Sequence, residues 1–160
     1  MRKIRLFQGL LILVVMLSSS LAWASVPEVS ADRTYYDINT GFYMLEGNVV
    51  VHVKNMEIQA PAARVSLATM EVYAEGGISV FQGGAFFSGD SVYINGRERH
   101  AYIDGNIRME DNGLTITGSR ADFNWRTKDV ILSDVTITDA AGQRYAAEAV
   151  YNVRSKSLSY

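Results

Sequence analysis

The chain of 160 residues is 48% hydrophobic and 20% charged, which is the composition of one folded domain and excludes a disordered chain. It contains no cysteine, which excludes disulfide frameworks, thiolate metal sites and thiol nucleophiles, and its two prolines exclude proline-rich and collagen-like classes. The formal net charge of −2 gives no electrostatic basis for binding nucleic acid.

The first 24 residues have the pattern of a secretory signal peptide. Three basic residues among the first five precede an apolar run over 10–17, and Ala22 and Ala24 place small residues where signal peptidase reads them. Cleavage after Ala24 predicts one mature domain over 25–160. The alternative is an uncleaved membrane anchor, because the segment that ends at Ala24 approaches the length of a membrane span.

The rest of the chain repeats every 29 residues without gaps. The tripeptides Glu46-Gly47-Asn48, Glu75-Gly76-Gly77 and Asp104-Gly105-Asn106 recur at that spacing. A second series at the same step consists of large apolar residues, namely Val29, Ile58, Phe87, Ile116 and Tyr145. A fixed period of this length predicts a stack of structurally equivalent units.

Within each copy the apolar residues alternate with polar ones, which is typical of half-buried strands. The first copy shows this at Leu45, Val49 and Val51. The alternation changes phase in the middle of the second strand of each copy, next to a small residue, which predicts a bend or bulge. The fourth copy departs, because Val135 and Ile137 fall on the opposite parity, and a register change is expected there. The predicted fold is all-β, with bent antiparallel strands forming two facing sheets.

Catalytic and metal-binding patterns are weak. His52 and His100 are expected on a solvated surface, and Glu46, Glu75 and Asp104 are expected in turns. We predict no catalytic residue, no metal site and no cofactor. The alternative is a carbohydrate-active β-solenoid that uses the three carboxylates as a ladder.

The last copy is cut in mid-repeat, so the final strand is expected to have an open edge. Such an edge favours pairing with another strand. We predict that Val150, Tyr151 and Val153 belong to this edge and support assembly. An open-ended stack with apolar rows inside is typical of a modular filament or a conduit.

The repeated turns at 45–49, 74–78 and 103–107, and the stretches IQAPAARV, FSGDSVYI and ITGSRADF that follow them, resemble the OstA-like proteins of lipopolysaccharide transport. Within that family the likeness is greatest to the LptA-type periplasmic bridge proteins. It covers about residues 28 to 160.

The resemblance implies a β-jelly roll shaped like a half-open taco, with no enzymatic activity, that carries lipopolysaccharide from the inner to the outer membrane. It also implies three partners in the periplasm: LptC-like jelly rolls, LptD-like jelly rolls and further copies of itself, joined end to end. Two alternatives stay open, an anchored LptC-like subunit and a ligand-free structural β-repeat protein. The residues predicted to line the groove for lipid A acyl chains are Leu45, Val49, Val51, Ile58, Val65, Ile78, Val80, Phe87, Ile94, Ile103, Ile107, Ile116 and Phe123.

Overall fold

The computed structural model describes residues 28–53, 56–82 and 84–160, and these form an all-β fold. Eight long strands are flanked by two short ones at the N-terminal end and one at the C-terminal end. The strands are β1 (Glu28–Ser30), β2 (Arg33–Asp37), β3 (Phe42–Val53), β4 (Met56–Ser66), β5 (Glu71–Gln82), β6 (Ala85–Asn95), β7 (His100–Asp111), β8 (Leu114–Asn124), β9 (Asp129–Asp139), β10 (Gly142–Asn152) and β11 (Ser157–Ser159).

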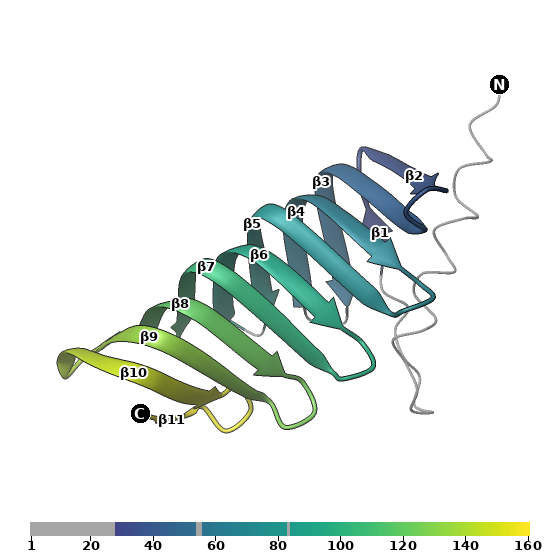
Figure 1. The fold of residues 1–160 in the computed structure, drawn as a ribbon. Helices are drawn as coiled ribbons and strands as arrows, with labels where there is room; N and C mark the ends of the chain where they lie inside the picture. The colour runs from purple at the N-terminus through teal and green to yellow at the C-terminus, as the bar shows by residue number, and fades with distance from the viewer. Residues whose placement is uncertain (1–27, 54–55, 83) are drawn as a thin grey trace.

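All strand pairs are antiparallel and belong to one sheet, in which the strands from β3 to β11 follow chain order. β1 and β2 both pair with β3, one with each half of it. Figure 1 shows that every long strand curves sharply near its middle, so the sheet folds into a V with two walls. The two predicted facing sheets are therefore the two walls of one continuous sheet.

We call the wall that contains Phe42–Glu46 of β3 and Glu148–Asn152 of β10 wall A. The wall that contains Val49–Val53 of β3 and Gly142–Ala146 of β10 is wall B. The strand register shifts at the corner between the walls in each of the five pairs from β3–β4 to β7–β8, whereas the β8–β9 and β9–β10 pairs keep one register throughout.

The corner is built from residues with positive φ. In β3 these are Gly47 (φ 73°) and Asn48 (φ 47°), and in β7 they are Gly105 (φ 79°) and Asn106 (φ 47°). Two successive residues in this region reverse the direction in which the following side chains point, and glycine and asparagine adopt it at least cost. The acidic-Gly-Asn tripeptides therefore mark the corners, as predicted.

The fourth corner is one residue shorter. β3, β5, β7 and β9 begin 29 residues apart, at Phe42, Glu71, His100 and Asp129, whereas β8 and β10 begin 28 apart, at Leu114 and Gly142. In β9 the corner holds Asp134 alone, with φ 53°. This missing residue is the physical reason why Val135 and Ile137 change parity, and both are nevertheless buried at 1% and 0% exposure.

Apolar side chains line the inside of the V. One cluster extends from β4 to β10 and includes Ile107, Ile116, Leu132 and Ile137 at its centre, while a second, smaller cluster surrounds Leu45 under β1 to β5. Burial of these rows, at about 25 cal/mol per Å² of apolar area, is the main force that holds the two walls together.

Residues 1–24, predicted to be a signal peptide or an anchor, lie outside the described residues. In the portion of the chain that the structure describes, no helix has the length and apolar composition needed to cross a membrane.

Candidate functional site

The thirteen residues predicted to line an apolar interior all lie on the inner face of the V. The strand register aligns them in rows that cross the sheet. On wall A, Leu45 and Ile103 belong to one row of paired residues that ends at Ala149. Val65, Ile94 and Phe123 belong to the row beside it, nearer the lip of the V. Val49, Ile78 and Ile107 follow the corner glycines.

A row of eight residues crosses wall B, and we call it the wall B row. Its members are direct register partners from strand to strand. They are Val51, Ile58, Val80, Phe87, Met109, Ile116, Ile137 and Arg144.

Burial along the wall B row is graded from one end of the sheet to the other. Val51, Ile58, Val80 and Phe87, on β3 to β6, are half-buried. Met109, Ile116 and Ile137, on β7 to β9, are 3%, 0% and 0% exposed. The apolar side chains of this row are therefore partly accessible on β3 to β6 and covered on β7 to β9.

The covered part is joined across the V by polar contacts. Tyr151 on wall A donates a hydrogen bond from its hydroxyl to Asp111 Oδ2 on wall B, at 2.8 Å, and Lys156 forms an ion pair with the same carboxylate. Tyr151 is 2% exposed and Asp111 is 5% exposed. Burial, followed by the hydrogen bond to Asp111, raises the pKa of the Tyr151 hydroxyl, so this group is a neutral donor at physiological pH.

Side chains from the lips of both walls complete this closure. Leu114 of wall B and Trp125, Val153 and Leu158 of the opposite lip pack against the large apolar cluster. Nearby, Arg144 pairs with Asp139 through Nη1 and Oδ1 at 3.2 Å, and the Arg144 guanidinium lies 5.5 Å from the ring centroid of Tyr160. Charged groups therefore occupy the β10 end of the inner face, where the apolar part of the wall B row stops.

The contacts of Asp111 across the V were not predicted from the sequence, although the alternation along β7 indicates that Asp111 points inward. Ile107, Met109 and Asp111 share one parity, so Asp111 must point inward. Its partners are 40 and 45 residues away, and no local pattern identifies them.

The sequence predicted an open strand edge at Val150, Tyr151 and Val153, and this prediction is wrong about where the edge lies. β11 pairs with this part of β10, with Val150 opposite Ser159 and Tyr151 opposite Leu158. Tyr151 and Val153 point into the apolar cluster instead. The remainder of β10, from Gly142 to Ala149, has no described partner besides β9, so the available edge lies on wall B and at the corner.

The two histidines differ from each other. His52 is half-exposed in its side chain, at 51%, as expected for the surface. The prediction of a solvated His100 is wrong, because its side chain is 26% exposed and both ring nitrogens are engaged. Nδ1 lies 2.7 Å from Asp122 Oδ1, and Nε2 lies 3.0 Å from Asn124 Nδ2.

The carboxylates Glu46, Glu75 and Asp104 lie on the outer face of wall A. They sit on alternate strands, with Ala62 and Ser91 as the register partners between them. Two strand spacings correspond to roughly 10 Å, which is too far for shared ligation of one cation. Among the described residues no group of three or more His, Cys, Asp or Glu side chains could hold a metal ion.

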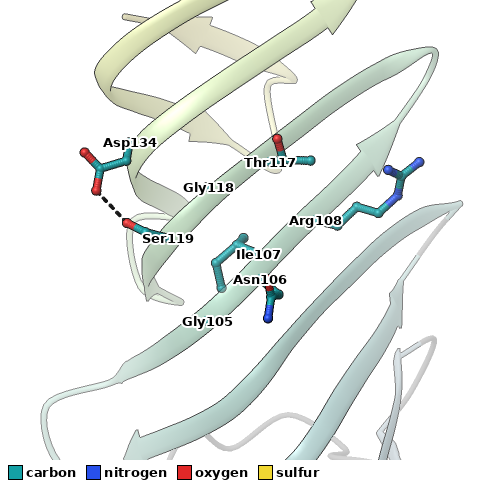
Figure 2. Close-up of a pocket in the computed structure, with 8 residues that line it drawn as sticks. All are labelled: Gly105, Asn106, Ile107, Arg108, Thr117, Gly118, Ser119 and Asp134. Carbon is teal, nitrogen blue, oxygen red and sulfur yellow. Dashed lines mark hydrogen bonds between the residues drawn. The ribbon is translucent and has the colours of Figure 1, made fainter.

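A depression of about 680 Å³ lies at the corner of β7, β8 and β9. Its lining includes Asn106, Arg108 and Thr117, and the hydrogen bond from the Ser119 hydroxyl to Asp134 Oδ2 at 2.7 Å borders it (Figure 2). The depression lies where the fourth corner lacks one residue. Three of its polar side chains already have partners, because Ser119 bonds to Asp134, Asn106 to Asp90 and Arg108 to Glu110.

Comparison with known proteins gives a consistent result. A family described as "LptA/(LptD N-terminal domain) LPS transport protein" matches residues 28–157. Among solved structures the chain is similar to LptH, the LptA-homologous periplasmic component of the lipopolysaccharide transport device from Pseudomonas aeruginosa. The TM-score is 0.54 at 15% identity, over 61% of this chain and 75% of that chain. No match is found among curated proteins.

Proposed function

The chain belongs to the LptA/LptD N-terminal domain family of lipopolysaccharide transport proteins, and we propose that it is a periplasmic bridge protein that passes lipopolysaccharide from the inner to the outer membrane. In this proposal the predicted signal peptide, residues 1–24, is removed on export. The inner face of the V is the apolar groove that receives the acyl chains, and no reaction is catalysed.

The observation that carries the proposal is the graded wall B row. Val51, Ile58, Val80 and Phe87 form a continuous apolar strip across four strands and keep part of their surface accessible. A monomeric protein normally covers such a strip unless it contacts a ligand or a partner. Acyl chains are the ligand whose shape and chemistry fit a long, narrow, uncharged row of aliphatic and aromatic side chains.

Partial burial suits transport better than full enclosure. Each buried methylene contributes about 0.8 kcal/mol, so complete enclosure of several acyl chains would reach tens of kcal/mol and hold the lipid permanently. A strip that covers only one side of each chain binds with a fraction of that energy. The similar residues on successive strands give neighbouring positions of similar affinity, between which the lipid can move.

The proposed partners are LptC-like and LptD-like jelly rolls and further copies of this chain, joined end to end. Support comes from the two ends of the sheet. Among the described residues, Gly142–Ala149 of β10 has no partner besides β9, and two short strands, β1 and β2, form the opposite end. An added strand of a neighbouring jelly roll would continue the sheet at such an edge.

A second candidate is a structural β-repeat protein of the envelope with a filled interior and no ligand. The fully buried residues under β7 to β9, among them Ile116 and Ile137, favour it for that half of the molecule. This second candidate does not explain why the apolar strip on β3 to β6 stays accessible.

The chain offers a matched pair for the test. Phe86 and Phe87 are adjacent on β6, but Phe87 faces the wall B row whereas Phe86 packs against Phe81 on the outer face, with ring centroids 5.1 Å apart. A photo-crosslinking phenylalanine analogue is placed at each position in cells that make lipopolysaccharide. We expect a lipopolysaccharide adduct at Phe87 and none at Phe86. A folded protein with no adduct at Phe87 would support the filled structural repeat instead.

A further inference from the structure

The segment from Lys156 to Tyr160 crosses from one wall of the V to the other. β11 pairs with wall A through Val150, while Lys156 reaches Asp111 and the ring of Tyr160 covers Arg144, both on wall B. The side chain of Leu158, between them, packs on the apolar cluster. The segment therefore covers the inner face at the β10 end of the sheet.

We propose that this segment is a displaceable latch, and that lipid held on the inner face of β3 to β6 leaves toward the β10 end only when the latch opens. This inference rests on the proposed function, because it concerns the path of the same lipid. It adds a closed state in which the protein holds its lipid and an open state in which it releases it.

The polar core of the latch is the first reason for this inference. Asp111 is buried and follows Ile107 and Met109 on the inward side of β7, where a carboxylate is costly unless it is hydrogen-bonded. In the closed state Tyr151 and Lys156 satisfy it. In the open state the Tyr151 bond remains and water would take the place of Lys156, which means that both states are tolerated. An apolar residue at this position would favour only the closed state.

The second reason is the weak attachment of the segment. β11 has three residues, with three register pairs to one half of β10, whereas the long strands pair over most of their length. The side chain of Lys156 is 41% exposed, and Tyr160 is 62% exposed. By contrast the groups that receive the segment, Asp111 and Tyr151, are buried and belong to long strands. The segment can detach while its docking site stays folded.

A disulfide tests the latch directly, because the chain has no cysteine of its own. Val150 and Ser159 are register partners on the outer face, so the pair Val150→Cys and Ser159→Cys would join β11 to β10 without changing the interior. The matched control is Ser30→Cys with Val50→Cys, which ties the three-residue strand β1 to β3 at the other end of the sheet. Intact mass verifies each bond.

Oxidised and reduced donors are loaded with purified lipopolysaccharide, and its transfer to an acceptor copy is followed by the Phe87 crosslink in the acceptor. We expect the oxidised Val150–Ser159 donor to retain its lipid and to transfer it at least about tenfold more slowly than the reduced form. The control lock should have no such effect. Equal transfer by oxidised and reduced donors would overturn the latch and leave the proposed function intact. Failure of every donor to bind lipid would overturn both.

A substitution with the opposite effect separates the latch from a merely structural role. Lys156→Met removes the ion pair to Asp111 and should speed transfer, by about tenfold for the loss of a charge-assisted hydrogen bond. Lys128→Met is the matched control, because Lys128 holds the equivalent turn position one copy earlier, with the same backbone bond to an asparagine carbonyl at 2.8 Å. Unchanged or slower transfer by Lys156→Met alone would contradict the proposal.

Discussion

Asn106 donates a hydrogen bond from its side-chain amide to Asp90 Oδ2 at 2.7 Å, and Asn48 donates the same bond to Asp32 Oδ2 at 2.8 Å. In both pairs the residues are 16 apart, and the bond ties a corner to an earlier part of the chain, β6 for Asp90 and the connection between β1 and β2 for Asp32. At the fourth corner the roles are exchanged, because Ser119 donates to Asp134 across 15 residues. The acid has moved to the other strand, so the contact is kept although one residue is missing.

The first prediction concerns the space at these corners. A Cβ atom at Gly105 would lie 2.3 Å from Asp90 Oδ2, whereas a Cβ at Gly113 would meet nothing within 4 Å. The two glycines have nearly equal φ, 79° and 77°, so both alanine variants carry the same backbone strain of about 1–2 kcal/mol. Gly105→Ala should lower the free energy of unfolding by more than Gly113→Ala, measured with urea. Equal losses would show that Asp90 moves away freely.

The second prediction concerns the bond between the walls. Tyr151→Phe leaves the buried carboxylate of Asp111 with fewer donors and should cost about 1.5–3 kcal/mol, as for other hydrogen bonds to charged groups. Combining it with Asp111→Ala in a double-mutant cycle should give a coupling energy of that order, read from urea unfolding. Tyr145→Phe, at a tyrosine that is 76% exposed, is the control and should have little effect.

The third prediction compares two isoleucines of the wall B row. Ile116 is 0% exposed, and Ile116→Ala should cost about 2–5 kcal/mol through lost burial and the cavity left behind. Ile58 is half-buried, so Ile58→Ala should cost less than half as much while weakening lipopolysaccharide binding. Chemical unfolding and binding are measured on the same samples. The reverse order of the two stability losses would contradict the burial gradient.

The fourth prediction concerns acid. Hydrogen bonds from Thr69 and Tyr93 lower the pKa of Glu71 below 4.5, and those from Arg144 and the Ala141 amide lower the pKa of Asp139 below 3.8. These bonds stabilise the fold above the ordinary pKa values, and the contribution is lost as the pH falls through the lowered ones, because the unfolded chain then binds more protons. The urea midpoint should be steady near neutrality and fall below about pH 4.5. Asp139→Asn should reduce the slope; an unchanged slope would exclude Asp139 as a contributor.

Most of the fold could be predicted because its determinants are local. Alternation assigned the inward rows, and the acidic-Gly-Asn tripeptides marked corners that need positive φ at Gly47 and Gly105. The departure of the fourth copy traces to the single residue missing beside Asp134. It moves every later position by one, so Arg144, and not the exposed Tyr145, follows Ile137 in the wall B row.

The contacts across the V could not be read from the sequence in this way. Tyr151 and Asp111 are 40 residues apart and belong to different walls, and only the angle of the V brings them within hydrogen-bond distance. The sequence shows that Asp111 faces inward but not which group satisfies it. The cover that β11 forms over Val150 was missed for a similar reason, since three residues carry too little pattern to mark a strand.

The order of strands in the sheet also has a consequence for how the molecule folds. From β3 onward each strand pairs with the strands next to it in the chain, so the register partners of every hairpin are at most a few tens of residues apart. Loop closure is then inexpensive at each step, and a nucleus at any hairpin can grow by adding one neighbour at a time. Rapid folding follows for an all-β chain of this size. Hydrogen exchange should begin at the two outermost strands and reach the amides of β7 and β8 last.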